Sequence, residues 1–482
     1  MLVQLNDTYP GSVDKDKPGD NRTIRNMRAG RIAKNFFLHM HAARVHPHSL
    51  KLTYTFGLGL ILASLFLVMI ITGLILMLHY TPSVGQAYDS VKDIIFIVPG
   101  GRYIRNMHRW AAHGMVLVAF LHLARVFYTG SYLQQRTTNW IIGVSILVVV
   151  LFMNFSGYLL PWDQLAYWAV TIGSNIAASA RELTDLLGIT SMFDAGGFMK
   201  KLLIGDETVG QPALTRFFMF HVVFLPLTLI ILTAVHFWRI RKDGGLTRPV
   251  TEKLTGDGHT RAAGRPRQSS DGKWYSWPVV MWAELATLLC VSATVMVIAF
   301  LFDAPLKEQA NPAFPENPAK APWYFLGIQE LVSYSAFSGG LLIPLLFLVF
   351  LISIPYIDRE DRYAGIWFSG RKGIHITLYS AFFTVLVTLI ILLVYIRFGW
   401  LREWIPAVPR SIIMILNPAT LTGCLYVTWA VWVGKKTRST RSAAIALFTC
   451  AMTALLIFTV IGIWFRGPNW EFFWPGSEGA VQ

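Results

Sequence analysis

Four histidines lie in two apolar segments of the chain, as two pairs of nearly equal spacing. His108 and His122 are 14 residues apart, and His221 and His236 are 15 residues apart. In an α-helix, 14 residues return to within about 40° of the starting face and rise about 21 Å, whereas 15 residues overshoot by about 60°. Pro226 lies between the second two histidines, where it can supply a local kink. Each segment therefore presents two imidazoles near one face, at two depths.

Two glycine pairs repeat this spacing in two other apolar segments. Gly59 and Gly73 are 14 residues apart, and so are Gly143 and Gly157. If the four segments cross a membrane in alternating directions, Gly59 and Gly143 share the level of one histidine pair, and Gly73 and Gly157 share the level of the other. Glycine lets a flat macrocycle approach a helix backbone closely, although tight helix packing also uses such glycines.

Together these patterns predict two bis-histidine sites stacked across a membrane. His108 faces His221 in one site, and His122 faces His236 in the other. Two imidazoles leave an iron no open coordination position, which suits a haem b that carries electrons and does not bind oxygen. The three cysteines lie in apolar runs without close spacing, so an iron–sulfur or zinc site on this chain is not expected.

Three arginines lie in or beside the first histidine segment, where a charge is costly in lipid and usually functional. Arg105 and Arg109 flank the first histidine of that segment, and Arg125 follows the second by three residues. We expect them to contact haem propionates, and extension of the side chains to the membrane surface is the alternative. His113 and His79 are interpreted as structural residues.

The composition argues against a soluble protein, because only 14% of the 482 residues are charged and 54% are apolar. Soluble domains carry roughly 25% charged residues, and about 20 apolar residues suffice to cross a bilayer. We predict an all-α integral membrane protein with about nine transmembrane helices, the first four of which form a dihaem four-helix bundle. The helices are expected near residues 52–80, 106–129, 139–160, 213–239, 278–302, 340–357, 374–397, 411–433 and 443–465.

Lysine and arginine are concentrated in the N-terminal segment and in the loops on its side of the membrane. This places the N-terminus on the cytoplasmic, negative (n) side, in the inner membrane of a bacterial cell. His108 and His221 then form the pair near the positive (p) side, and His122 and His236 form the n-side pair. The net charge of +15 fits contact with anionic lipids better than nucleic-acid binding. No signal peptide is visible, and residues 24–41 are typical of an interfacial amphipathic helix.

The stretches around the histidines are distinctive: RNMHRWAAHGMVLVAFLHLARVFYTGSY, GYLLPWDQLAYWAV and TRFFMFHVVFLPLTLIILTAVHFWRIRKDGG. They resemble cytochrome b of the quinol:cytochrome c reductases, the cytochrome bc and b6f complexes. HRW, PWDQ and the 15-residue histidine spacing are most similar to the b6 type. The resemblance covers roughly residues 30–400 and is most specific over the first four helices.

The resemblance implies a division of the chain into five parts. These are a cytoplasmic N-terminal segment (1–51), a dihaem cytochrome b domain (52–240), a basic n-side linker (241–277), a C-terminal, subunit IV-like cytochrome b domain (278–400), and two extra C-terminal transmembrane helices (401–482).

The function implied is that of a dihaem subunit in a quinol-oxidising respiratory or photosynthetic complex, inactive alone. It would carry electrons from p-side quinol to n-side quinone and build a proton-motive force. The implied partners are a Rieske iron–sulfur protein, a c-type cytochrome subunit and lipids, in a homodimeric complex. Two alternatives remain. One is a dihaem quinone-handling subunit of a different respiratory assembly, which could run towards quinone reduction. The other is a transporter or channel, which would leave the paired histidines unexplained.

The resemblance also assigns further residues. Pro161 and Trp162 would wall the p-side quinol pocket together with Trp323 and Tyr324, and Arg241 would lie near the n-side quinone.

Two family residues are replaced in this chain. Pro322 stands where the family has a glutamate that takes a quinol proton, and Gly57 stands where the b6 type has a cysteine that tethers a third haem. We therefore expect no covalent haem. We expect Glu330 or Asp163 to accept the proton instead, because general bases are usually histidine or carboxylate. A capping or solvated helix end is the alternative for both carboxylates. The ending WFRGPNWEFFWPG has no assigned role.

Overall fold

The computed structural model describes residues 44–45, 47–243, 245–247, 274–275, 279–358, 360, 363–409, 412–413 and 416–474. The expected amphipathic helix at 24–41 and most of the basic linker lie outside the described residues. Regular structure in the described part is helical, apart from two short strands. These strands, β1 (Arg44–Val45) and β2 (Trp274–Tyr275), pair antiparallel and join the N-terminal segment to the end of the linker.

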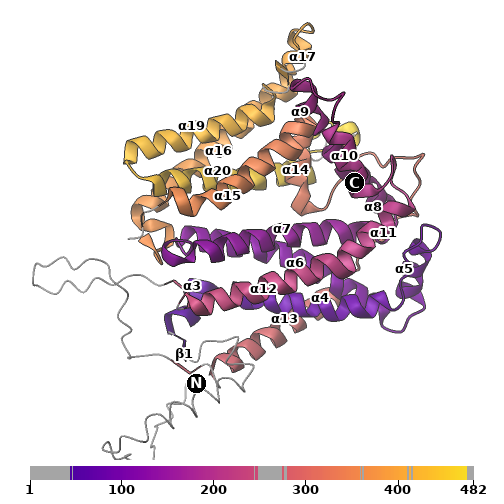
Figure 1. The fold of residues 1–482 in the computed structure, drawn as a ribbon, viewed down its shortest axis with the longest axis horizontal. Coiled ribbons are helices and arrows are strands. Elements are labelled where there is room, and N and C mark those ends of the chain that lie inside the picture. The colour runs from indigo at the N-terminus through magenta and orange to yellow at the C-terminus, as the bar shows by residue number, and fades with distance from the viewer. Residues whose placement is uncertain are drawn as a thin grey trace, which may run out of the picture.

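Four long helical segments form the first bundle (Figure 1). They are α4 (Leu58–Met77), α6 (Gly101–Tyr128), α7 (Thr137–Leu159) and a continuous segment made of α11 (Gln211–Met219), the π-helical turn η3 (Phe220–Phe224) and α12 (Leu225–Lys242). The closest helix pairs are α4 with α6 and α7 with α12. Helices are the expected solution for such apolar sequences, because all their backbone groups are hydrogen-bonded within the segment.

The C-terminal helices lie on two sides of this bundle (Figure 1). On one side, α13 (Met281–Leu301) packs on α4 and α6. On the other side, α15 (Ile343–Ile357) packs on α7. Beyond it lie α16 (Arg371–Phe398), α19 (Pro418–Thr437) and α20 (Thr440–Trp464), with α14 (Trp323–Tyr334) and the π-turn η5 (Ser338–Leu342) beside them.

Short helices occupy the connections. They are η1 (Pro47–Leu50), α3 (Leu52–Thr55), α5 (Ala87–Phe96), η2 (Gln134–Arg136), α8 (Gln164–Ala178), α9 (Arg181–Leu186), α10 (Ala195–Ile204), η7 (Trp367–Ser369), α17 (Leu401–Trp404) and η8 (Pro468–Trp470).

Eight described helices are long and apolar enough to cross a membrane, so the prediction of a multi-pass all-α protein is confirmed. The ninth predicted span, near 411–433, corresponds to α19, which packs against α16 and α20 but is less apolar than the other eight. Its Thr residues and the basic end at Lys435 and Lys436 account for the lower hydropathy.

The π-turn η3 explains why a 15-residue histidine spacing works in this fold. His221 lies inside η3, between α11 and α12. A π-turn closes i→i+5 hydrogen bonds and so takes up one residue more than an α-helical turn. The 15 residues between His221 and His236 therefore span nearly the same rotation as the 14 residues between His108 and His122. Pro226, which has no N–H to donate, follows the turn directly, where the α-helical ladder is already interrupted.

The last two helices of the chain, α19 and α20, are integral to the fold, because they pack on each other and on α16. Half of the most apolar stretch of α20 is buried, the largest share among the eight spans. Buried ion pairs hold both of its ends. At the N-terminal end of α20, Arg441 lies 3.4 Å from Asp358 and also donates to the carbonyl oxygen of Phe127 in α6.

Just after the C-terminal end of α20, Arg466 makes a bidentate ion pair with Glu330 of α14. Glu330 is fully buried and accepts two more hydrogen bonds, from Trp470 Nε1 at 2.9 Å and from the Tyr334 hydroxyl at 2.9 Å. The C-terminal ending, to which the sequence alone assigned no role, therefore supplies two of the partners of this carboxylate.

We predict that Arg466→Met destabilises the protein by about 3 to 5 kcal/mol, because removal of one partner leaves a buried charge unpaired. The temperature of thermal unfolding in detergent should fall clearly. The double variant Glu330→Gln/Arg466→Met should be more stable than Arg466→Met alone. Arg102→Met, which removes an exposed ion pair with Asp303, is the control and should change the unfolding temperature far less. Equal effects at the two sites would contradict the stabilising role of the buried pair.

Candidate functional site

The two histidines predicted to lie near the p side, named the p-side pair after this prediction, lie opposite each other between α6 and η3. The ring centroids of His108 and His221 are 6.1 Å apart. His221 Nδ1 lies 3.0 Å from the carbonyl oxygen of Met153, which can only accept, so Nδ1 carries the proton. The Thr72 hydroxyl donates to the Val68 carbonyl oxygen at 2.8 Å. It is therefore an acceptor for Nδ1–H of His108, 2.9 Å away.

This hydrogen bonding fixes the same tautomer in both p-side imidazoles. Because Nδ1 is protonated in each neutral ring, the lone pair lies on Nε2. Metal-ligating histidines in proteins usually donate their other N–H to a carbonyl or other acceptor in this way. The p-side pair therefore has the donor set and the supporting hydrogen bonds of two axial ligands.

The pair predicted near the n side, called the n-side pair, lies at the other level of the same bundle, with His122 on α6 and His236 on α12. His122 Nδ1 is buried and has no hydrogen-bond partner within the described part of the chain. Arg125, one turn further along α6, is 5% exposed and lies 4.5 Å above the ring of Tyr54. Its Nη2 likewise finds no partner among the described residues. A buried, unsatisfied guanidinium nitrogen beside an imidazole fits contact with an anionic group such as a propionate.

Each of the four phased glycines lies against one of the four histidine rings. A Cβ added at Gly157 would lie 2.5 Å from His221 Cε1, and one at Gly73 would lie 3.1 Å from His108 Cε1. At the n-side level the corresponding distances are 3.7 Å from Gly59 to His122 and 3.5 Å from Gly143 to His236. The predicted levels are therefore confirmed. In the structure the glycines make room for the imidazoles themselves, most tightly at Gly157.

A cavity of about 280 Å³ opens at the p-side level. Its wall includes both p-side histidines and both p-side glycines, with mostly apolar side chains of α4, α6, α7 and α12 around them. Arg105 and Arg109 also line it. Arg105 is held by the loop after α13, because it donates to the carbonyl oxygens of Ala304 and Pro305 at 2.7 and 2.8 Å. Arg109 lies 5.8 Å above the ring of Tyr158.

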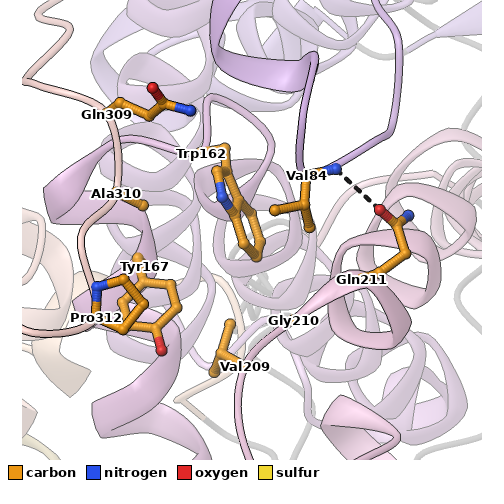
Figure 2. Close-up of a pocket in the computed structure, with 9 residues that line it drawn as sticks. All are labelled: Val84, Trp162, Tyr167, Val209, Gly210, Gln211, Gln309, Ala310 and Pro312. Atoms are coloured by element: carbon orange, nitrogen blue, oxygen red, sulfur yellow. Dashed lines mark hydrogen bonds between the residues drawn. The ribbon is translucent and has the colours of Figure 1, made fainter.

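The residues expected at the p-side quinol pocket divide between two cavities. Pro161 and Tyr324 line the cavity of the histidine pair. Trp162, whose φ of 52° places it in the left-handed region, lines a separate cavity of about 310 Å³ with Tyr167 and Pro312 (Figure 2). In this second cavity the Val84 N–H donates to Gln211 Oε1 at 2.9 Å.

Both of the expected carboxylate bases make contacts within the protein, and neither lines these cavities. Asp163 caps α8 by accepting from Ala166 N–H at 2.9 Å, and its other oxygen accepts from Lys307 N–H at 3.0 Å. Glu330 is occupied by its ion pair with Arg466 and by the two further donors. The contacts thus favour the helix-cap alternative for Asp163, whereas Glu330 is neither a cap nor solvated but the buried partner of Arg466. Arg241 lies in the last turn of α12, five residues after His236.

The sequence analysis missed His113 as a residue of the site. It lines the cavity of the p-side pair, and its Nδ1 accepts a hydrogen bond from Trp323 Nε1 at 3.1 Å. The polar contact was expected, but the position was not. In the sequence, the available signal was that His113 follows Arg109 by one helical turn and lies on a different face of the helix from His108.

The fold and the histidine pairs define a membrane protein built to hold flat, metal-containing groups between helices. The family model for cytochrome b/b6/petB matches residues 43–244. A cytochrome b6 of Prochlorococcus marinus is 40% identical over 200 residues, which are 42% of this chain and 85% of that protein. Cytochrome b6 of Heliobacterium mobile is 40% identical over 215 residues, 45% of this chain and 92% of that protein.

This chain therefore belongs to the cytochrome b/b6 family, and the predicted b6-type resemblance of its N-terminal half is confirmed. Membership implies haem. The solved structure titled "Hyperthermophilic respiratory Complex III" has a chain that matches 92% of this chain and 96% of its own length, with a TM-score of 0.57 and 20% sequence identity. The common fold thus extends beyond the haem bundle into the C-terminal helices.

We predict that Gly157→Ala lowers the haem-to-protein ratio, because the added methyl group would collide with the imidazole of His221 and shift its Nε2. Gly423→Ala in α19 is the matched control, since a Cβ there meets nothing within 4 Å. The ratio is measured as pyridine haemochrome per purified chain. An unchanged ratio in Gly157→Ala would show that the close approach is not needed for binding.

Proposed function

We propose that this chain is the dihaem cytochrome b subunit of a quinol-oxidising bc-type complex. The observation that carries the proposal is the pair of bis-histidine levels, with a glycine under each ring and, at the p-side level, both imidazoles held in the tautomer that presents Nε2. His108 and His221 would hold one haem b, and His122 and His236 the other. When bound, the two haems supply single-electron carriers at two depths of the membrane.

The protein's own residues position these groups and exclude water. Thr72 and Met153 hold the Nδ1–H groups of the p-side imidazoles, so these rings cannot rotate freely. The apolar side chains around them keep the level dry, and Arg109 and Arg125 offer positive charge where propionates would lie. Arg105 shares the cavity wall, but its donors are taken by the loop after α13.

Quinol would bind at the p-side end and be oxidised there. Pro161 and Tyr324 border the p-side cavity, Trp323 supports its wall through His113, and Trp162 borders the neighbouring cavity. Quinone would be reduced at the n-side end, near Arg241. Proton release on one side and uptake on the other would build the proton-motive force. The N-terminus would lie on the cytoplasmic side.

The proposed complex would contain further subunits. A Rieske iron–sulfur protein and a c-type cytochrome would take the p-side electrons, in a dimeric assembly like that of the family. The structural similarity to a respiratory complex III chain supports this assembly.

A second candidate function is a dihaem quinone-handling subunit of a different respiratory assembly. It is favoured by Pro322, which stands at the N-terminus of α14 where the family has an acidic residue, and by the engaged carboxylate of Glu330. In this case the quinone would be reduced rather than the quinol oxidised.

The ligand assignment predicts that His122→Leu loses one of two spectrally distinct b haems. The p-side haem should remain, because its ligands and their hydrogen bonds lie on a different level. Redox titration of the α-band in membranes measures this as the loss of one of two midpoint potentials. His79→Leu is the control and should keep both midpoint potentials. Two intact haems in His122→Leu would contradict the ligand assignment.

The complex type predicts that the purified protein brings a Rieske protein with it and oxidises quinol in its presence. Mass spectrometry of the affinity-purified complex identifies the partner, and reduction of an added cytochrome c follows the reaction. A haem-loaded complex without an iron–sulfur subunit would favour the second candidate function. We expect no third, covalently attached haem, because Gly57 offers no thiol.

A further inference from the structure

We propose that His113, held by Trp323, donates a hydrogen bond from its Nε2–H to an oxygen of the quinone ring at the p-side site. This inference rests on the proposed function, since it presupposes that a quinone binds there. His113 would then touch the substrate directly and would not be only a structural residue of α6.

The hydrogen bond from Trp323 fixes which nitrogen of His113 carries the proton. The indole Nε1–H of Trp323 can only donate, and it lies 3.1 Å from Nδ1 of His113. Nδ1 must therefore be the acceptor, and in the neutral imidazole the proton lies on Nε2. This tautomer is opposite to that of His108 and His221, whose protons lie on Nδ1. His113 thus presents a donor, where the two p-side ligands present lone pairs.

The position of His113 brings this donor to the wall of the p-side cavity. Its ring lies 5.6 Å from that of Tyr324 in an edge-on arrangement and 5.4 Å from that of Trp110. Trp110 is itself fixed, because its Nε1 donates to the Phe302 carbonyl oxygen at 2.8 Å. Nε2 of His113 makes no hydrogen bond with any residue that the structure describes. The ring is therefore held in place on one edge while its other edge offers a donor without a partner.

Most other polar side chains of this cavity are already committed. The Tyr80 hydroxyl donates to the Leu160 carbonyl oxygen at 2.7 Å, and Asn154 Nδ2 donates to that of Val150 at 2.9 Å. Arg105 is held by two carbonyl oxygens of the loop after α13. His113 thus differs from these side chains, because its Nε2–H is available to donate to a ligand.

The chemistry of the donor indicates a quinone oxygen rather than a carboxylate. Arg109 places a cation on the same wall, and a guanidinium makes stronger hydrogen bonds to carboxylates than a neutral group does. A neutral imidazole N–H suits the neutral oxygen of a quinone. Such an oxygen would lie near the aromatic rings of Tyr324 and Trp110, and no charged group would have to lose its solvation there. A haem propionate is the other acceptor that this donor could meet.

The test is the infrared difference spectrum of a quinone labelled with ¹³C at its carbonyl groups, bound to the haem-loaded complex. In the wild type, a hydrogen bond should shift one labelled carbonyl band to lower frequency. His113→Leu should return this band towards the frequency of a free carbonyl and weaken quinone binding by about two- to tenfold, as expected for loss of one hydrogen bond. His113→Gln keeps a side-chain N–H donor and should keep most of the shift.

His79→Leu is the matched control, because this exposed histidine near the p-side end of α4 does not line the cavity. It should leave the labelled band and quinone affinity unchanged, and haem content should be normal in all variants. A labelled band that stays at its wild-type frequency in His113→Leu, or a band that moves equally in His79→Leu, would overturn the inference. A change confined to bands of ¹³C-labelled haem propionates would overturn it in favour of the haem. If the wild-type protein binds no quinone, the proposed function and this inference both fail.

Discussion

The structure depends on bringing pairs of bulky, polar imidazoles opposite each other inside a bundle of apolar helices. An imidazole in lipid needs a partner for its N–H, and it needs space that neighbouring helices normally fill with side chains. Thr72 and Met153 meet the first need at the p-side level, and the glycines of α4 and α7 meet the second at both levels. The π-turn η3 adds a third device, since it turns His221 to the same face as His236 despite the extra residue between them.

The second constraint is the attachment of the C-terminal helices to the haem bundle. Burying an ion pair is costly unless the geometry is good and the remaining hydrogen-bonding positions are filled. Both pairs on α20 meet this condition, because Glu330 accepts from Arg466, Trp470 and Tyr334, and Arg441 reaches the Phe127 carbonyl oxygen as well as Asp358. Through its hydrogen bond to Phe127, Arg441 joins the N-terminal end of α20 directly to α6, the helix that carries His108 and His122.

The sequence was sufficient for the features that depend on local periodicity. Histidine and glycine spacings follow from helix geometry, and transmembrane spans follow from composition, so the histidine levels and the spans were predictable. The π-turn was not, because Pro226 signals an interruption without saying whether the helix kinks or widens. The roles of Arg466 and Trp470 were hidden for another reason. Their partner Glu330 lies 136 and 140 residues away in the sequence, and no periodic pattern connects such residues.

The placement of carboxylates at the p-side end limits how a quinol proton could leave. Among the described residues that line the two cavities there is no aspartate or glutamate. Asp163 is held by two backbone N–H groups. The acceptor positions of Glu330 are filled by Arg466, Trp470 and Tyr334, and a carboxylate in a bidentate pair with arginine gains little from a proton. Pro322, which directly precedes α14, has no acidic side chain either. His113 presents a donor in its observed tautomer, so it orients an oxygen rather than taking a proton from it. An ordered water or a partner subunit is therefore the acceptor most consistent with the described walls of the site.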